Sequence, residues 1–244
     1  TALADRQPSP LARRILTGRL LVGAALSDIR RYPDHYIRAE QTTGGWLLSG
    51  TISWVSGWGL NSALAVGAVD PKSESVVTAL LPVDHHTRSE HLELSALGGS
   101  RTDRVTLDRA FVAAEDVISV QTLAEWRTSD LATAGDARAH HFGLAQAILA
   151  ELEQDREPLA RKVAYTWRPR VAAIRSRAYA LSDEATASGN AVYRIEDRLA
   201  TKAASGEALS ALSRALVISR SGRGLSRDDT AQLHARNALF VLVQ

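Results

Sequence analysis

The sequence changes its pattern once along its length, and this change limits the possible folds more than any other feature. Between about residues 20 and 112, short apolar or alternating runs are separated by Gly, Pro, Asp and Asn, which is typical of strands joined by turns. From about Val120 the strand pattern stops, and Ala- and Leu-rich segments with helical spacing follow. Strands first and helices second predict an α+β protein, a small antiparallel β-barrel or sandwich followed by an antiparallel helical bundle.

This pattern divides the chain into three parts. Residues 1–19 are predicted to be a short helical remnant or linker, in which Ser9 caps a helix that begins at Pro10. Residues 20–115 form the predicted β domain. Residues 116–244 form the predicted C-terminal helical bundle.

Glycine and proline set the expected ends of the elements. Pro169 is expected to kink a long helix or to cap a new segment, and the pair Ser205-Gly206 is expected to separate two shorter helices. The expected strands cover residues 20–26, 46–56, 63–69, 75–81, 91–97 and 104–108, and the expected helices cover residues 8–16, 132–152, 158–187, 191–204, 207–219 and 227–243.

Composition excludes several classes of function. The chain has no cysteine, which excludes disulfides, thiolate nucleophiles and Cys-ligated metal sites. A net charge of +2 without a dense Lys/Arg block does not predict a nucleic-acid-binding protein. No apolar run approaches the ~20 residues of a membrane span, and residues 1–14 lack the apolar segment of a signal peptide, so we expect a cytoplasmic protein. The adjacent histidine pairs 85–86 and 140–141 point to different faces of their elements, so no metal site is expected.

The most specific segment is residues 44–57, with the sequence GGWLLSGTISWVSG. A Gly-Gly-aromatic turn leads through Leu-x-Gly to Trp54, an aliphatic residue and Ser56, and this order resembles the middle domain of the acyl-CoA dehydrogenase family. The resemblance implies that Trp54 lies against the flavin ring of FAD and that Ser56 contacts its polar edge, which suits a flat ring needing a few fixed polar partners. Ile52 stands where the family usually has Lys. The alternative is a structural hairpin with a buried Trp.

Two further segments resemble cofactor-binding motifs of the family. Residues 25–28 (ALSD) resemble its Leu-Thr-Glu turn, which implies that Ser27 contacts the flavin. Residues 221–225 (SGRGL) resemble its glycine loop, which implies that Gly222 and Gly224 lie close to the pyrophosphate or adenosine of the cofactor. The alternatives are an Asx turn in the first segment and a plain pair of helix caps in the second.

The matching segments follow the family's order over about residues 20–244. They include residues 97–112, which resemble the strand pair that leads into the family's helical domain. The family's N-terminal helical domain has no counterpart here beyond the short helix at residues 8–16. Family members are usually dimers or tetramers packed through the helical domain, so the resemblance implies a homodimer or homotetramer.

The resemblance implies a flavin-dependent oxidoreductase that carries FAD and oxidises an acyl-CoA-type thioester. This reaction needs a carboxylate within reach of the substrate's α-proton. The usual base position falls at or next to Gln244, whose amide cannot act as a base, and Glu151 and Glu153 lie where a second branch of the family has its Glu. Residues 151–156 look like a solvated helix end, so no catalytic residue is assigned. The alternatives are a flavin-dependent monooxygenase of the same fold, which needs no such base, and a catalytically inactive member that acts in assembly.

Overall fold

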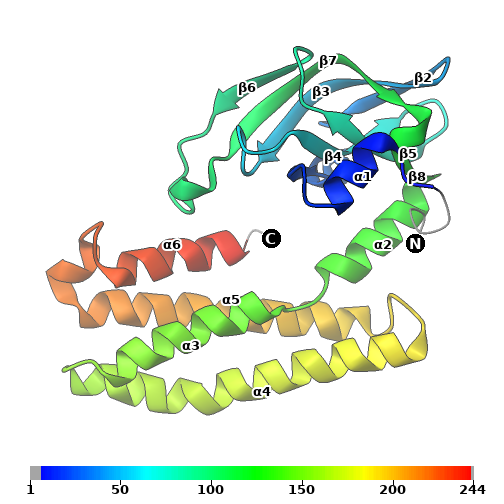
Figure 1. Ribbon diagram of the computed structural model, residues 1–244. Helices are drawn as coiled ribbons and strands as arrows, with labels where there is room; N and C mark the ends of the chain where they lie inside the picture. Colours follow the sequence, from blue (N-terminus) through cyan, green and yellow to red (C-terminus); the bar gives the residue numbers. More distant parts are fainter. Residues whose placement is uncertain (1–6, 243–244) are drawn as a thin grey trace. The chain divides into compact units, whose positions relative to one another are not determined.

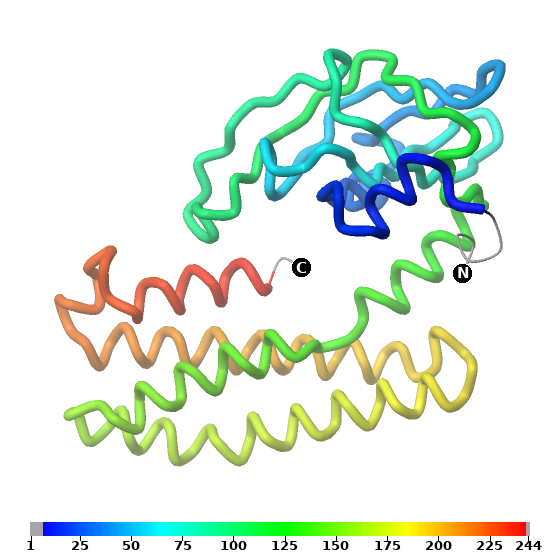
Figure 2. The backbone as a smooth tube through the Cα atoms, viewed as in Figure 1, coloured from blue at the N-terminus to red at the C-terminus, as the bar shows by residue number. Residues whose placement is uncertain are grey.

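The computed structural model describes residues 7–242. The chain divides into two compact units, here called the sheet unit and the helical unit. The sheet unit comprises the chain up to Leu94 together with Gly98–Arg127, and the helical unit comprises Ser95–Leu97 and the chain from Thr128 onward. Strands make up most of the first unit and long helices make up the second (Figure 1; Figure 2). Each unit buries an apolar core of its own.

The sheet unit is built on one eight-stranded sheet. Its strands lie in the order β6-β7-β3-β2-β4-β5-β8, with β1 beside β4. The pairings are antiparallel except that β1 and β2 both run parallel to β4. The predicted α+β class is therefore confirmed, with two parallel contacts inside a mainly antiparallel sheet. The strands are β1 (Val22–Ala25), β2 (Arg38–Thr42), β3 (Gly45–Val55), β4 (Ala63–Asp70), β5 (Ser75–Pro82), β6 (Thr87–His91), β7 (Asp103–Ala113) and β8 (Val117–Thr122).

The core of the sheet unit lies where the strands are most apolar. Almost every residue of β4 is buried, because the strand has neighbours on both edges and covered faces. In β7, buried and exposed residues alternate over most of the strand, as expected for a strand with one wet face. Large buried side chains of this core include Leu48, Ile52, Leu64, Leu81 and Leu107.

Several strand predictions were wrong, and for β2 and β6 polar sequence is the reason. Strands β2 and β6 are almost entirely polar, with Ala39 the only buried residue of either, so neither gave an apolar signal. Residues 91–97 were expected to form a strand, but β6 ends at His91, and Leu97 has a φ of 55°, in the left-handed region. Strand β8 was missed, because the last expected strand ended at residue 108.

Short helices complete the sheet unit. Helix α1 (Pro10–Leu16) begins as predicted, because the Ser9 hydroxyl accepts the Ala12 backbone N–H at 3.0 Å and Pro10 needs no partner at the first helical position. The 3-10 helices η1 (Ser27–Arg31), η2 (Gly98–Ser100) and η3 (Ala114–Asp116) lie in the connections between strands.

The helical unit packs four long helices around one core. Helices α4 and α5 form a hairpin, α3 packs on both of them, and α6 packs on α3 and α5. Large buried side chains of this core include Ile148, Leu149, Leu209 and Leu212. The helices are α2 (Leu123–Ala134), which spans the boundary between the units, α3 (Ala139–Glu153), α4 (Pro158–Ser188), α5 (Ile195–Ser219), the 3-10 helix η4 (Ser221–Leu225) and α6 (Thr230–Leu242).

Three helix predictions were also wrong. The helix expected over residues 132–152 is two helices, α2 and α3, with a break after Ala134. Helix α4 continues through Pro169, so this residue does not cap a new segment; it is exposed, and the carbonyl that loses its N–H partner can face water. The pair Ser205-Gly206 lies inside α5, where both residues are buried. A Cβ on Gly206 would lie 2.5 Å from Leu242 Cδ2, so glycine allows α5 and α6 to pack closely.

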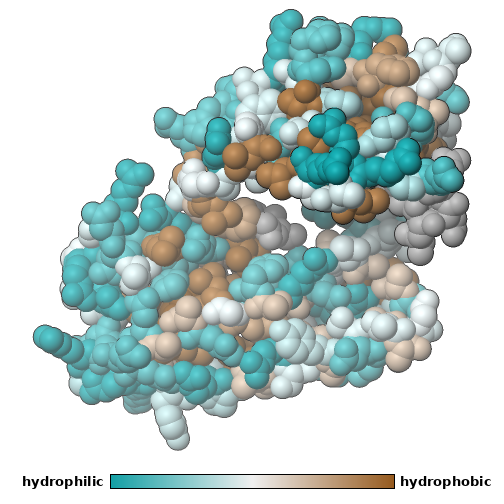
Figure 3. All heavy atoms as spheres, in the orientation of Figure 1, coloured by the Kyte–Doolittle hydropathy of each residue, from teal (hydrophilic) through white to brown (hydrophobic). Residues whose placement is uncertain are grey.

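The surface of the helical unit is mostly polar on the face seen in Figure 3, with apolar residues scattered among the charges. No helix within residues 7–242 is both long enough and apolar enough to cross a membrane. Exposed large apolar side chains of this unit include Leu159, Tyr165, Ile218, Leu225 and Leu239.

Candidate functional site

Strand β3 carries a β-bulge near its C-terminal end. Its pairing with β7 shifts between Ile52 and Val55, so that Ser53 and Trp54 together oppose one residue of β7. Ile52 and Val55 are buried, whereas Trp54 is 48% exposed. An extra residue in a strand re-aims the side chains beside it, and here it holds an indole at the surface. The alternative of a buried structural Trp therefore does not describe Trp54.

Asp28 ties η1 to this bulge. Its side chain is buried, and it accepts the Ser53 backbone N–H at Oδ2 (2.8 Å) and the Ser53 hydroxyl at Oδ1 (2.7 Å). A buried carboxylate is tolerated only with such donors, so the two bonds fix η1 against β3. Ser27 precedes Asp28 in the chain and is exposed, and Trp54 follows Ser53. The structure therefore brings the two predicted flavin-binding segments of the sheet unit side by side.

Two basic side chains that the sequence reasoning missed also reach this point. Arg31 Nη1 lies 3.1 Å from Ser53 Oγ, and His35 Nε2 lies 3.3 Å from the same oxygen. Both side chains are substantially exposed, and both lie within 4 Å of Asp28 Oδ1. Both residues follow Asp28 within seven positions, and this closeness in sequence was the available signal. Within residues 7–242, no group of three or more His, Asp or Glu side chains is placed to hold a metal ion.

Ser56 follows β3 directly and faces the start of β7. Its hydroxyl oxygen lies 2.9 Å from Thr102 Oγ1, which lies 2.7 Å from Ser100 Oγ. Ser56 is exposed and Thr102 is buried. The pairing of Val55 with Asp103 explains the contact, since it places the next residue of one strand beside the preceding residue of the other.

The two predicted glycines of the helical unit lie in η4 and differ in their surroundings. Gly224 is buried, and a Cβ there would lie 2.3 Å from the Val217 carbonyl oxygen, so packing within the chain already requires glycine. Gly222 is exposed, with open space where its Cβ would lie. A ligand can therefore approach the backbone at Gly222.

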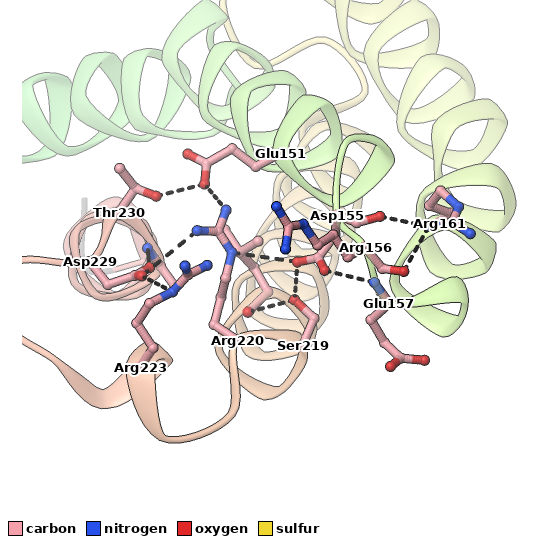
Figure 4. Close-up of polar contacts among 12 residues, drawn as sticks. Glu151, Asp155, Arg156, Glu157, Arg161, Ser219, Arg220, Arg223, Asp229 and Thr230 are labelled. Atoms are coloured by element: carbon pink, nitrogen blue, oxygen red, sulfur yellow. Dashed lines mark hydrogen bonds and ion pairs between the residues drawn. The ribbon is translucent and has the colours of Figure 1, made fainter.

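A charged network, centred on Arg220, joins α3, α5 and α6 of the helical unit (Figure 4). Arg220 contacts three carboxylates, at 2.7 Å from Glu151, 3.4 Å from Asp155 and 3.7 Å from Asp229. Glu151 and Asp155 lie close together at the C-terminal end of α3, whereas Arg220 and Asp229 come from distant segments, so only the folded bundle assembles the network. An arginine held by several carboxylates in a half-buried position is a strong structural tie.

Glu151 is committed to this network. It accepts hydrogen bonds from Thr230 Oγ1 at 2.6 Å and from His234 Nε2 at 2.8 Å, in addition to Arg220. Burial alone would raise the Glu151 pKa, but these partners outweigh it and hold the pKa below the usual value. Glu153, the other acidic candidate, pairs with Arg168 at 2.5 Å. The expectation of a freely solvated helix end was therefore wrong at Glu151.

An open pocket of about 620 Å³ lies beside the network. It is lined by three acidic and three basic side chains, so its charges balance and favour neither an anion nor a cation. Its lining residues are Glu151, Gln154, Asp155, Arg156, Glu157, Ser219, Arg220 and Arg223.

Comparison with known proteins finds similar structures but no similar sequence. No protein-family model matches the chain, and no curated protein sequence matches it. A probable acyl-CoA dehydrogenase from Mycobacterium abscessus superposes with a TM-score of 0.78 at 11% identity, covering 98% of this chain and 70% of that one. The chain has the acyl-CoA dehydrogenase fold.

Other solved structures with the acyl-CoA dehydrogenase fold give the same result. A glutaryl-CoA dehydrogenase from Mycobacterium smegmatis in complex with FADH2 matches with a TM-score of 0.73 at 18% identity, over 97% of this chain and 66% of that one. Butyryl-CoA dehydrogenase from Megasphaera elsdenii matches with a TM-score of 0.74 at 15% identity, over 94% and 65% of the two chains. The chain thus spans about two thirds of the length of these proteins. At such identities the likeness establishes the fold, and function has to be argued from the site.

Proposed function

We propose that this chain is the sheet-plus-helical part of a flavin-dependent oxidoreductase that binds FAD and acts on an acyl-CoA-type thioester. The observation that carries the proposal is the half-exposed Trp54, which the β3 bulge holds at the surface beside η1. The exposed indole offers a flat apolar face, and a flat aromatic ring system is a suitable partner for it. The structures that share the fold include one that binds FADH2, which supports the choice of a flavin.

The residues around Trp54 fit a flavin. The indole offers an apolar face for a ring to stack on, and Ser27 and Ser56 add exposed hydroxyls in the same part of the sheet unit. Bound flavin supplies the ability to accept a hydride, and these side chains would bind and orient it and keep water from one face. In the helical unit, Gly222 is a proposed contact for the polar part of the cofactor because its backbone is accessible, and Gly224 shapes the loop that carries it.

Titration of the full chain with FAD tests this proposal. We expect FAD to bind and its fluorescence to be quenched by the stacked indole. We expect Trp54→Ala to weaken binding by about 5- to 150-fold, since stacking on an aromatic side chain contributes about 1–3 kcal/mol. Phe111→Ala is the matched control, because Phe111 is 49% exposed on the same sheet and has no assigned role. A wild-type chain that binds no FAD, or equal losses in both variants, would contradict the proposal.

The acidic residues of α3 favour a second candidate within the same chemistry. Glu151 and Glu153 are both held in ion pairs, so neither is free to take a proton from a substrate. A flavin-dependent monooxygenase needs no such base. The two reactions are separated by anaerobic bleaching of bound FAD with an acyl-CoA, which a dehydrogenase shows, and by oxygen consumption with externally reduced flavin, which a monooxygenase shows. Failure of both assays in a chain that binds FAD would favour an inactive member that acts in assembly.

We also propose that the helical unit forms a homodimer or homotetramer in the cytoplasm. The exposed apolar side chains Leu159, Tyr165 and Ile218 support self-association, because a second copy of the chain could cover them. Light scattering after size-exclusion chromatography measures the mass directly, and a monomer at micromolar concentration would contradict the proposal.

A further inference from the structure

Three hydroxyl groups form a continuous chain at the end of β3. Ser56 Oγ lies 2.9 Å from Thr102 Oγ1, and Thr102 Oγ1 lies 2.7 Å from Ser100 Oγ. The outer member Ser56 is exposed, Ser100 is half-buried, and the central Thr102 is only 4% exposed. Water therefore has little access to the central hydroxyl, and its hydrogen bonds must come from the two serines.

The backbone around these hydroxyls is fixed. The Gly57 N–H donates to the Ser100 carbonyl at 2.8 Å, and the Asn61 side-chain amide donates to the Ser56 carbonyl at 2.7 Å. Arg101, between Ser100 and Thr102, has a φ of 50°, in the left-handed region that non-glycine residues seldom adopt. A residue held in such a conformation at the edge of a site is a reason to look for function there.

The three hydroxyl groups can arrange their hydrogens in two self-consistent ways. Thr102 has one hydroxyl hydrogen, so it can donate to only one of its two neighbours at a time. If Thr102 donates to Ser56, the hydrogen of Ser56 is free to donate outward. If Thr102 donates to Ser100, Ser56 donates to Thr102 and turns its lone pairs outward. The two arrangements differ only by rotation of hydroxyl groups, and no covalent bond forms or breaks.

We propose that this hydroxyl chain lets Ser56 serve bound flavin as a donor in the oxidised state and as an acceptor in the reduced state, with Thr102 as the positioning residue. The inference rests on the proposed function. The chemical reason is that a flavin ring nitrogen that accepts a hydrogen bond when oxidised carries an N–H after reduction, so the same contact must change direction. A lone serine could rotate freely, but here Thr102 holds its oxygen in place for both directions and polarises it through the second bond.

The proposal predicts that replacing Ser100 changes flavin binding, although Ser100 lies at the opposite end of the three hydroxyl groups from Ser56. In Ser100→Ala, Thr102 can donate only to Ser56, so the donor arrangement is favoured and the acceptor arrangement leaves a buried hydroxyl hydrogen without a partner. We expect oxidised FAD to bind as in the wild type and reduced FAD to bind about fivefold more weakly. For a two-electron couple this ratio lowers the midpoint potential by about 20 mV.

The experiment measures FAD affinity in both oxidation states and the midpoint potential by equilibration with a reference dye, using the full chain. Thr102→Val is expected to weaken both states severalfold with little change in potential, and Thr102→Ser is expected to restore the wild-type values. Thr51→Val is the control, since Thr51 and Thr106 form another exposed hydroxyl pair, 3.3 Å apart, on β3 and β7. It should leave affinity and potential unchanged.

The outcomes separate this inference from the proposed function. A wild-type chain that binds no FAD overturns both. A wild-type chain that binds FAD, with an Ser100→Ala potential equal to its own, overturns the hydroxyl chain and leaves the proposed function standing. A Thr102→Ser variant that behaves like Thr102→Val, or a Thr51→Val variant that shifts the potential as much as Ser100→Ala, also overturns it.

Discussion

Replacing Arg198 with alanine is expected to destabilise the helical unit by about 3 kcal/mol. Arg198 is 4% exposed and lies on α5, where its guanidinium makes a two-pronged contact with Asp136 at 2.7 and 2.9 Å. It also donates to the carbonyls of Ala132 at 2.6 Å and Ala191 at 2.7 Å. One side chain thus joins the break between α2 and α3 to the turn before α5.

The magnitude follows from what the truncation leaves behind. Removing one member of a buried ion pair costs about 3–5 kcal/mol, mainly because the other charge loses its partner. The Asp136 side chain keeps 23% exposure, so water can solvate it in part, and this places the loss at the lower end of the range. Arg198→Lys should show an intermediate loss, because an ammonium group cannot reproduce the planar fork toward Asp136 and both carbonyls.

Urea unfolding followed by far-UV circular dichroism measures the effect. A loss of about 3 kcal/mol moves the midpoint by about 1–2 M for an m-value near 2 kcal/mol/M. Arg168→Ala is the control, because Arg168 makes an ion pair with Glu153 but its side chain is 51% exposed, and such pairs contribute about 0–1 kcal/mol. An Arg198→Ala midpoint equal to that of the wild type, or equal to that of the control, would refute the reasoning.

Three further outcomes are expected for the helical unit. Gly206→Ala should destabilise it by about 1–3 kcal/mol, because the new Cβ would lie 2.5 Å from Leu242 Cδ2. Gly143→Ala, at an open site inside α3, should stabilise it by about 0.5–1 kcal/mol. Urea midpoints of the two variants that move in the same direction would contradict this contrast. The lowered pKa of Glu151 contributes stability that is present above the usual carboxyl pKa and is lost as pH falls below it, so a wild-type urea midpoint that falls in acid no more than that of Glu151→Gln would rule this contribution out. Burial lowers the pKa of His141 to about 4 from 6.5, so the unfolded chain takes up this proton first and stability should fall from pH 6.5 toward pH 4; His141→Gln should remove that part of the slope, and an unchanged slope would argue against a buried neutral imidazole.

Sequence patterns predicted the elements whose signals are local. The cap at Ser9 and the long strand around Trp54 were correct, since a side chain close in sequence or an apolar run defines each. Polar strands such as β6 carry no apolar pattern in the sequence. Such a strand forms because a neighbouring strand, here β7, pairs with it, and the local sequence does not reveal that pairing. Gly206 was read as a break because glycine weakens an isolated helix, but tertiary packing against α6 outweighs that preference.

The candidate site shows the same division. Residue order alone suggested Ser27, Trp54 and Ser56. It could not show that Asp28 bonds to Ser53 and so joins the segments of Ser27 and Trp54, or that Thr102 contacts the Ser56 hydroxyl. The commitment of Glu151 was equally hidden, since its partners lie 69 to 83 residues further along the chain. Contacts of this kind depend on how the elements pack, and no local pattern encodes them.

The bulge in β3 has a consequence for how this site can change. A regular strand turns one of every two side chains outward, but the bulge gives two consecutive positions to that role. Ser53 holds η1, and Trp54 is left exposed for the proposed flavin contact. Loss of one residue here would restore regular pairing and leave Ile52 and Val55 in the core. The sheet would survive such a deletion, but Ser53 and Trp54 could no longer both lie on the outer side, so a single residue of strand length decides whether the proposed flavin contact can form.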